Sequence, residues 1–399
     1  MCKVYFATAK TVRYGLANAL MRKGEIVIYM ESNLGHWTIN KNTKLFTVGP
    51  AQMYPSTLTV RNHVVPYFRT SEFSDMMLEN KQWLLELVDA DKECEVVFLT
   101  ASGSGAMEAA VINCFDENDK LLVISGGTFG ERFEKICKIH KIPFDVIKLG
   151  QDETLSEIHL STYEGKDYTG LLVNLHETYT GQLYDIELIH DFCERNKLYL
   201  IVDAISTFLC DEYHMEKYNI DVTIISSQKG LCLAPGLSMV ILSRKIIKEK
   251  VSGNHIKSLY FDFNEYLLNI KRGQTPFTPC VGELFELNDM LHHIVERGGA
   301  KARVEEVKER CEYFRKNIKE LPVHYPSFPL SNAITPVRFD KDIAMDFFMY
   351  LKDEKNIMVN PVGGELGKCS IRVAHIGNLE LEDYDILIKE MRNFLKYRV

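Results

Sequence analysis

A lysine and an aspartate follow two apolar segments of the sequence, at points where strands are expected to end. Lys229 comes shortly after residues 222–225 (Val-Thr-Ile-Ile) and precedes a Pro-Gly turn at residues 235–236. Asp203 closes residues 200–202 (Leu-Ile-Val). A lysine amine can bond covalently to a carbonyl carbon, and a carboxylate is costly to bury unless it meets a cation. The pair could therefore hold an organic ring that carries both an aldehyde and a positive charge.

Pyridoxal phosphate (PLP) is a cofactor that requires such a pair. The lysine would bind its aldehyde, and the carboxylate would keep the ring nitrogen protonated so that the ring can accept electrons. Each residue also has a simpler interpretation, because Lys229 could be a solvated lysine and Asp203 a helix cap or a buried ion-pair partner. The polar residues 226–228 before Lys229 and the Pro-Gly turn after it fix its backbone closely, which favours the functional interpretation.

Three further turns follow expected strands and carry polar or aromatic groups. Ser102, Gly103 and Ser104 form a strand-to-helix turn whose N–H groups and hydroxyls could bind a phosphate, although such turns also occur without a ligand. Phe129 could stack on a cofactor ring or belong to the core. Thr178 could hydrogen-bond a bound ring or belong to a turn that caps the next helix.

Arg372 is a lone arginine inside the apolar segment 370–374. Its guanidinium fits the two oxygens of a carboxylate, which could belong to a substrate. A structural ion pair explains the same pattern nearly as well. The sequence therefore marks Arg372 as a candidate for substrate binding.

From about residue 94, short apolar runs alternate with helical patterns. Strands are expected at residues 96–99, 121–124, 144–147, 171–175, 198–202, 222–225 and 239–242, and helices at residues 130–141 and 187–197 among others. This alternation predicts an α/β fold in which helices sandwich a mostly parallel seven-stranded sheet. Ligands of such sheets bind beyond the carboxyl ends of the strands.

The pattern changes after residue 250 and predicts a second domain. We expect a large domain over residues 44–285, followed over residues 286–399 by a linking helix and a smaller C-terminal α+β domain. Its expected elements are helices over 283–297 and 300–320 joined at Gly298-Gly299, strands over 333–339 and 370–374, and a closing helix over 381–397. Residues 1–43 form an N-terminal extension of unknown role, with a helix expected over 11–22 and a strand over 25–30.

The composition excludes several classes of protein. Among 399 residues, 55 acidic and 47 basic side chains give a net charge of −8, which argues against a nucleic-acid partner. Ten scattered cysteines without a Cys-x-x-Cys pair indicate reduced thiols in the cytoplasm rather than disulfides or a zinc site. We expect no metal site, no signal peptide and no membrane span.

These ordered motifs, over roughly residues 44–399, resemble the class V aminotransferases of PLP fold type I, close to alanine–glyoxylate and 2-aminoethylphosphonate–pyruvate aminotransferases. The resemblance implies that Lys229 carries the cofactor and that Asp203 faces its ring nitrogen. It also implies that Arg372 binds the substrate carboxylate and that Gly49, in Gly49-Pro50, lines the substrate side. The remaining implied cofactor-binding residues are Ser102, Gly103, Ser104, Phe129, Thr178, Gln228 and Thr275.

The resemblance further implies that Thr275 reaches the phosphate of a neighbouring subunit, so that a homodimer shares its active sites. The implied reaction moves an amino group from alanine, serine or 2-aminoethylphosphonate to a 2-oxo acid such as pyruvate or glyoxylate. A cysteine desulfurase or lyase on the same fold is the alternative. Desulfurases that resemble this fold carry a histidine directly before the lysine, where this chain has Gln228. A non-catalytic protein with this fold is a third hypothesis.

Overall fold

The computed structural model describes residues 18–22, 25–29 and 43–398. The chain divides into two compact units, residues 1–43 and residues 44–399. In the first unit, β1 (Asn18–Arg22) and β2 (Glu25–Tyr29) pair antiparallel. The helix expected over residues 11–22 is therefore wrong for residues 18–22, and residues 11–17 lie outside the described residues. Residues 19–21 (Ala-Leu-Met) are good helix formers, but pairing with the β-branched strand β2 overrides that preference.

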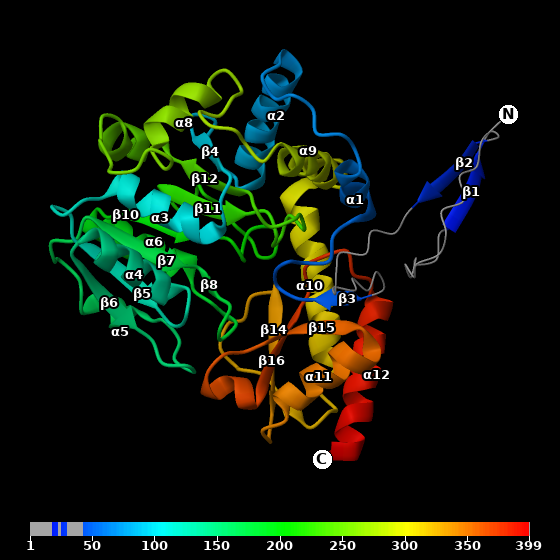
Figure 1. Ribbon diagram of the computed structural model, residues 1–399. Coiled ribbons are helices and arrows are strands. Elements are labelled where there is room, and N and C mark those ends of the chain that lie inside the picture. Colours follow the sequence, from blue (N-terminus) through cyan, green and yellow to red (C-terminus); the bar gives the residue numbers. More distant parts are fainter. Residues whose placement is uncertain (1–17, 23–24, 30–42, 399) are drawn as a thin grey trace, which may run out of the picture. The chain divides into compact units, whose positions relative to one another are not determined.

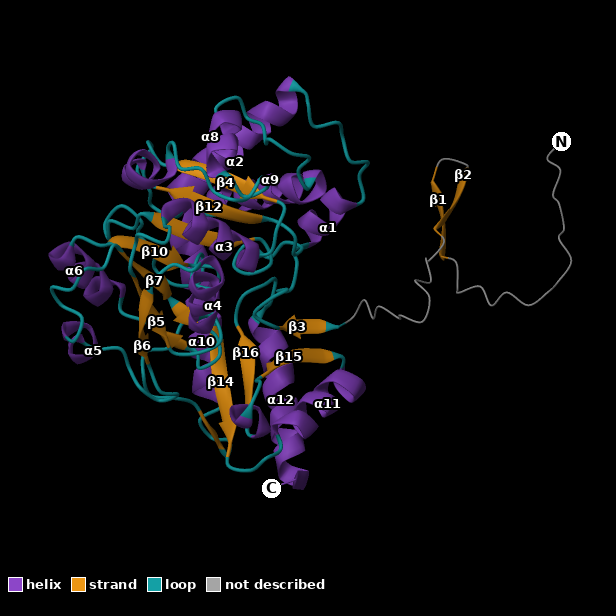
Figure 2. Ribbon diagram, turned by 60° about the vertical axis from the view of Figure 1, so that its left-hand side comes forward, coloured by secondary structure: helices purple, strands orange, loops and turns teal. Residues whose placement is uncertain are grey.

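Seven strands form the large sheet of the second unit, in the order β4-β12-β11-β10-β7-β5-β6 (Figures 1 and 2). Only the pairs that β12 forms, with β11 and β4, are antiparallel. This confirms the predicted mostly parallel sheet, and each strand lies within one residue of its expected bounds. The strands are β4 (Glu95–Leu99), β5 (Leu121–Ser125), β6 (Phe144–Lys148), β7 (Gly170–Asn174), β10 (Tyr199–Asp203), β11 (Val222–Ser226) and β12 (Ser238–Leu242).

Helices cover both faces of this sheet, because its strands are apolar on both sides. Every residue of β5, β7, β11 and β12 is buried. On one face, α3 (Gly103–Cys114) and α4 (Gly130–His140) share a core cluster with the strands. On the other face, α2 (Ser71–Leu87), α6 (Ile186–Asn196) and α9 (Val281–Glu296) share a second cluster with them. The shorter elements of this part are α1 (Pro55–Arg61), α5 (Glu157–Ser161), β8 (His176–Glu177), β9 (Gln182–Leu183), α7 (Arg244–Ile246) and α8 (Phe263–Ile270).

The strand directions bring the predicted site residues to one edge of the sheet. β4, β5, β7, β10 and β11 all run the same way, so their carboxyl ends lie side by side. In sheets of this kind the ligand binds beyond that edge. The residues at or just after these ends are Ser102, Phe129, Thr178, Asp203 and Lys229.

A second, five-stranded sheet has the order β13-β14-β16-β15-β3. β13 (Val323–His324), β14 (Ile334–Phe339), β15 (Ile357–Pro361) and β16 (Ser370–Ala374) come from the C-terminal part. β3 (Lys44–Phe46) comes from much earlier in the sequence and pairs parallel with β15. Helices α10 (Gly299–Asn317), α11 (Ala344–Lys355) and α12 (Leu381–Arg398) share the apolar core of this sheet. The expected domain boundaries at residues 43 and 285 stay a prediction.

Two glycines join α9 to α10 at the predicted position. Gly298 and Gly299 have φ values of +105° and +71°, which are backbone conformations that residues with a Cβ rarely adopt. The two long helices expected around residues 283–297 and 300–320 can therefore meet at a tight turn. Among the residues that the structure describes, every helix is too short or too polar to cross a bilayer.

Candidate active site

Lys229 lies on a closed turn just beyond β11. The Ser227 N–H donates to the Leu237 carbonyl (3.0 Å), and the Ser227 hydroxyl donates to the Ala234 carbonyl (2.5 Å). The Cys232 N–H donates to the carbonyl of Lys229 itself (2.8 Å). These bonds fix the backbone that carries the lysine, as the flanking serines and the Pro-Gly turn led us to expect.

Gly49 lies directly against the side chain of Lys229. A Cβ at position 49 would stand 2.7, 2.8 and 2.9 Å from the Cδ, Cε and Nζ atoms of the lysine. The segment is held from both sides, because the Val48 N–H donates to Asn360 Oδ1 (2.6 Å) and the Ala51 N–H donates to the Gln228 carbonyl (3.2 Å). A glycine is therefore required here for the lysine side chain to keep its place.

The surroundings of Lys229 favour its uncharged form. Burial lowers the pKa of the amine to about 8, and the nearby guanidinium of Arg372 acts in the same direction. The carboxylate of Asp203 opposes both effects. A lysine in water has a pKa near 10.4, so this amine is much more often a free nucleophile near neutral pH.

Asp203 ends β10 and is buried. Its Oδ1 accepts the N–H of Ile205 (2.9 Å), and its Oδ2 accepts the amide of Asn174 (3.1 Å). Burial raises the pKa of this carboxyl to about 6, although both hydrogen bonds lower it. A cation beside it would restore the charged form. Asn174 lies directly opposite Asp203 in the β7–β10 pairing.

The predicted phosphate site is the N-terminus of α3. Ser102 is the N-cap, and its side chain makes no capping hydrogen bond. Gly103 is packed tightly against the Ile205 side chain, which follows Asp203 closely in sequence. Gln228 is oriented by the Ser226 hydroxyl, which donates to its Oε1 (2.6 Å). Uncapped N–H groups at a helix start, with serine hydroxyls beside them, suit a phosphate.

Phe129 and Thr178 lie on turns that a buried carboxylate connects. Glu177 accepts the N–H groups of Phe129 (3.2 Å) and Gly130 (3.3 Å) on Oε2, and that of Tyr179 (3.0 Å) on Oε1. The hydroxyl of Thr178 is buried without a hydrogen-bond partner, so it can serve a ligand.

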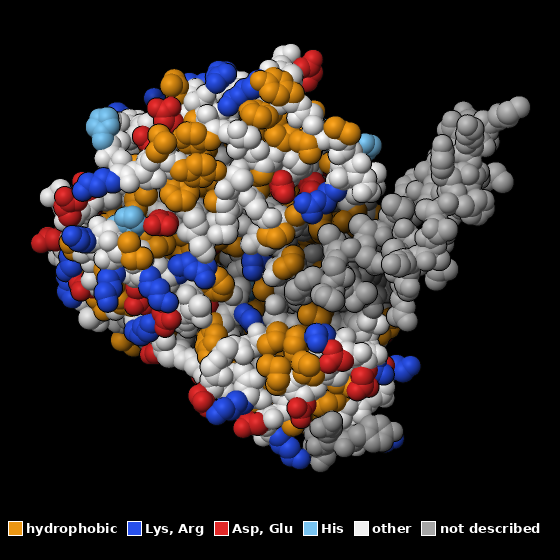
Figure 3. All heavy atoms as spheres, viewed as in Figure 1, with side chains coloured by type: hydrophobic (Ala, Val, Ile, Leu, Met, Phe, Trp, Pro, Cys, Tyr) orange, Lys and Arg blue, Asp and Glu red, His pale blue; other side chains and the backbone are white. Residues whose placement is uncertain are grey.

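Arg372 reaches the same place from β16 of the second sheet. Its Nη1 donates to the Thr178 carbonyl (2.9 Å) and its Nη2 to the Pro361 carbonyl (2.7 Å). Its Nε is buried and has no hydrogen-bond partner in the structure. Two backbone carbonyls thus hold the guanidinium in place without neutralising its charge. Figure 3 shows this face hollowed between the two sheets, with Lys and Arg side chains (blue) inside.

Thr275 is not brought to these residues within the chain. Its hydroxyl donates to the Phe277 carbonyl (2.7 Å), and its own carbonyl accepts a hydrogen bond from Arg69 (3.0 Å). Its role toward a neighbouring subunit stays a prediction.

Sequence reasoning missed three residues of the site. Asn174 donates a hydrogen bond to Asp203, and Glu177 connects the turns of Phe129 and Thr178. The Arg132 guanidinium lies 4.7 Å from the centre of the Phe129 ring. Asn174 could have been found, because it is a polar residue at the end of an otherwise apolar strand. The partners of Glu177 are distant in sequence, and only the fold reveals them.

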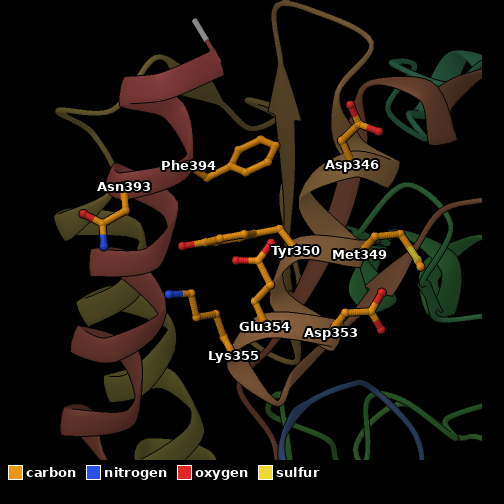
Figure 4. A pocket seen from close by; sticks show the side chains of 8 residues that line it. All are labelled: Asp346, Met349, Tyr350, Asp353, Glu354, Lys355, Asn393 and Phe394. Carbon is orange, nitrogen blue, oxygen red and sulfur yellow. The ribbon is translucent and has the colours of Figure 1, made fainter.

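A groove elsewhere contains none of the predicted site residues. It lies between α11 and α12, and Figure 4 shows the side chains that line it. The Tyr350 hydroxyl and the Lys355 amine both bind Glu390 (2.6 and 3.1 Å). Several of the polar groups around this groove are therefore bound to other groups of the protein.

The residues at the sheet edge fit PLP. Asp203 lacks a strong cationic partner. Thr178 Oγ1 and Arg372 Nε are buried without a hydrogen-bond partner, and the start of α3 has no side-chain cap. These four vacant interactions match a ring nitrogen, the polar groups around the ring, a substrate anion and a phosphate. Lys229 supplies the amine for the aldehyde.

Comparison with known proteins identifies relatives over most of the chain. The model of the family described as aminotransferase class V matches residues 56–377. A "soluble hydrogenase 42 kDa subunit" of Anabaena cylindrica is 29% identical over 83% of this chain and 86% of its own length. A 2-aminoethylphosphonate–pyruvate transaminase of Lysinibacillus sphaericus is 27% identical over 89% of this chain and 98% of its own length.

A solved structure has the same fold. The alanine–glyoxylate aminotransferase of Nostoc sp. superposes with a TM-score of 0.82, at 22% identity, over 92% of this chain and 99% of its own. The names of these similar proteins differ from one another.

The contact between Gly49 and Lys229 gives a first prediction. The Gly49→Ala methyl group should displace the lysine side chain and lower kcat on the order of 10- to 100-fold, because small misplacements of reacting groups have effects of that size. PLP incorporation should fall in parallel, while far-UV circular dichroism stays unchanged. Gly150→Ala is the control, because its methyl group would meet only Glu153, at ordinary contact distance. Wild-type incorporation and turnover in Gly49→Ala would contradict the assigned contact.

The raised pKa of Asp203 gives a second prediction, for the protein freed of cofactor. Because folding raises this pKa from 3.8 to about 6, the folded state binds the proton more tightly than the unfolded state. The resulting stabilisation amounts to about 3 kcal/mol. It is complete below 3.8, the pKa of Asp203 in the unfolded state, and is lost as the pH rises through about 6, the pKa in the folded state.

Asp203→Asn has no such proton to lose. Its free energy of unfolding relative to wild type, from urea titrations, should therefore rise between about pH 4 and about pH 6 and then level off. The exposed Asp342→Asn is the control. A constant difference between Asp203→Asn and wild type across this range would contradict the burial argument.

Proposed function

Because the chain belongs to the class V aminotransferase family, whose members use PLP, we propose that it moves an amino group from a small donor to a 2-oxo acid. Donors such as alanine, serine or 2-aminoethylphosphonate and acceptors such as pyruvate or glyoxylate fit the site. The names of the relatives from Lysinibacillus sphaericus and Nostoc sp. support this choice.

One observation carries the proposal: three ionisable side chains converge at the carboxyl edge of the large sheet. Asp203 ends β10, Lys229 follows the neighbouring strand β11, and Arg372 donates to the carbonyl of Thr178, which follows β8 (2.9 Å). A covalent amine, a carboxylate for a ring nitrogen and a cation for a substrate carboxylate are what amino transfer requires. A protein that merely kept the fold would not need all three in reach of each other.

Each predicted residue has a role toward the cofactor. Lys229 would bind its aldehyde, and Asp203 would hold its ring nitrogen as a cation. Ser102, Gly103, Ser104 and Gln228 would bind its phosphate, Phe129 would stack on its ring, and Thr178 would donate a hydrogen bond beside it. When bound, PLP supplies an electron sink for the charge that develops at the donor Cα.

The remaining residues act on the substrates. Arg372 would bind the carboxylate or other anionic group of the donor through its vacant Nε, while the Thr178 and Pro361 carbonyls keep the guanidinium from turning. Gly49 lines the same side. The Lys229 amine would take the proton from the Cα of the donor, because it is uncharged more often than a lysine in water. In the second half-reaction it would return a proton to the corresponding carbon of the acceptor.

We also propose a homodimer that shares its active sites. The segment after α1 exposes Val64 (93%), Tyr67 (69%) and Val65 (61%), and exposed apolar patches of this kind mark interaction surfaces. Figure 3 shows hydrophobic side chains gathered over the region where Figure 1 places α1, α2, α8 and α9. Arg69 binds both Gln274 Oε1 (2.9 Å) and the Thr275 carbonyl (3.0 Å), so Thr275 is held beside this patch. A second copy there would receive Thr275 at its phosphate.

The cytoplasm suits the thiols of this protein. Nine cysteines in the described residues are unpaired, and most of them are buried. Burial raises the pKa of several, including Cys94 to about 11 and Cys137 to about 12, so they are unreactive. A reducing compartment keeps such thiols free.

Half-reactions test the proposed activity. Cofactor-loaded protein incubated with a donor and no acceptor should lose the visible absorbance of its lysine-bound cofactor, and pyruvate or glyoxylate should restore it. Lys229→Ala should reduce turnover at least about 10³-fold, because it removes both the covalent amine and the proton carrier. The exposed Lys248→Ala is the control. Release of sulfide or another fragment without the change in absorbance would favour the desulfurase or lyase alternative.

Mixed dimers test the shared site. Neither a Lys229→Ala subunit nor a Thr275→Val subunit forms an intact site with itself. A dimer of one of each has one site that combines Lys229 with Thr275 of the partner subunit. Titration with PLP should therefore show wild-type affinity in up to half of the sites of that dimer. A monomer in sedimentation, or the absence of any wild-type sites, would contradict the proposal.

A further inference from the structure

Glu177 is a buried acidic residue to which the proposed function assigns no contact with the cofactor or the substrate. It belongs to β8, is 1% exposed, and accepts three backbone N–H groups on its two oxygens. Two of these come from the turn that carries Phe129, and the third comes from the residue after Thr178. One carboxylate therefore joins two turns, and Phe129 on one of them precedes Glu177 by 48 residues in the sequence.

The turn of residues 126–130 wraps closely around this carboxylate. A Cβ at Gly127 would stand 2.7 Å from Glu177 Cδ, and a Cβ at Gly126 would collide with the Tyr184 hydroxyl. Both carboxylate oxygens face only N–H donors. Burial raises the pKa of the Glu177 carboxyl, and the three N–H donors oppose that shift because they favour the ionised form.

Glu177 also acts on Arg372. Burial lowers the pKa of the Arg372 guanidinium, and the charge of Glu177 opposes that effect. Arg372 is bonded in turn to the carbonyl of Thr178, the residue that follows Glu177 (2.9 Å). The same side chain thus influences the aromatic turn on one side and the substrate arginine on the other.

We propose that Glu177 is a positioning residue that fixes the Phe129 ring and the Arg372 guanidinium in a set relation, and so couples the cofactor side of the site to the substrate side. This inference rests on the proposed function for the roles of those two residues. Glu177 itself touches no reacting atom. Its effect is to hold backbone groups where their side chains meet the ligands.

Glu177→Gln separates this role from simple filling of space. The amide has nearly the same shape, but its NH₂ group must face either the Tyr179 N–H or the N–H groups of Phe129 and Gly130. One of the two turns then loses its acceptor and meets a donor instead. The loss of the negative charge also leaves Arg372 less well compensated.

The experiment compares Glu177→Gln with Glu153→Gln, an exposed glutamate that likewise accepts a backbone N–H, from Gly150 (2.8 Å). PLP dissociation constants, visible circular dichroism of bound PLP and the separate values of KM and kcat are measured on the full chain. We expect Glu177→Gln to weaken PLP binding about tenfold, to change the visible dichroism and to raise the donor KM more than it lowers kcat. Glu153→Gln should match wild type.

Two further variants keep the inference testable if Glu177→Gln folds poorly. Gly127→Ala pushes on the carboxylate from outside and should give the same pattern. In a Phe129→Leu background, Glu177→Gln should weaken PLP binding by much less than it does alone. Wild-type affinity, dichroism and KM in Glu177→Gln or Gly127→Ala, or equal losses with and without Phe129, would overturn the positioning role. Absence of PLP binding by the wild-type protein would instead overturn the proposed function.

Discussion

The burial of opposite charges at one edge of a parallel sheet is the constraint on which the site depends. Asp203 is buried at the end of β10, and Lys229 is half-buried on the turn that follows the neighbouring strand β11. Loss of contact with water shifts both pKa values so that the neutral forms are favoured, to about 6 for Asp203 and about 8 for Lys229. Such burial is costly unless a ligand restores the lost interactions. A protonated ring nitrogen and an aldehyde do this together, which explains why a stable fold keeps both groups in so unfavourable a place.

The second sheet supplies the substrate side of the site. Gly49 is delivered by β3, which pairs with β15, and Arg372 lies on β16 of the same sheet. The large sheet therefore carries the residues for the cofactor. The small sheet contributes the Arg372 guanidinium and the segment of Gly49, which has no side chain to obstruct the lysine. Glu177 lies where the two meet, because it holds the Phe129 turn and affects the charge of Arg372.

Much of this could be predicted from the sequence, for identifiable reasons. The seven strands of the large sheet are apolar on both faces, so short buried runs marked them to within one residue. Asp203 and Arg372 stood out as charged residues in apolar segments, and Lys229 stood out because polar residues and a Pro-Gly turn enclose it just after such a segment. The close approach of Gly49 to Lys229 could not be predicted, since it depends on β3 joining the C-terminal strands. Glu177 was missed because its partners are distant in sequence. The hairpin of β1 and β2 was partly mistaken for a helix, because pairing outweighed the preference of residues 19–21.

The central claim is that the amine of Lys229 binds the cofactor covalently beside Asp203. Reduction of the PLP-loaded protein with borohydride, followed by proteolysis and mass spectrometry, tests it most directly. The account predicts that the added mass of the cofactor lies on the peptide that contains Lys229, in wild type and at a lower level in Gly49→Ala. Labelling of a different lysine, or labelling that persists unchanged in Lys229→Ala, would contradict it.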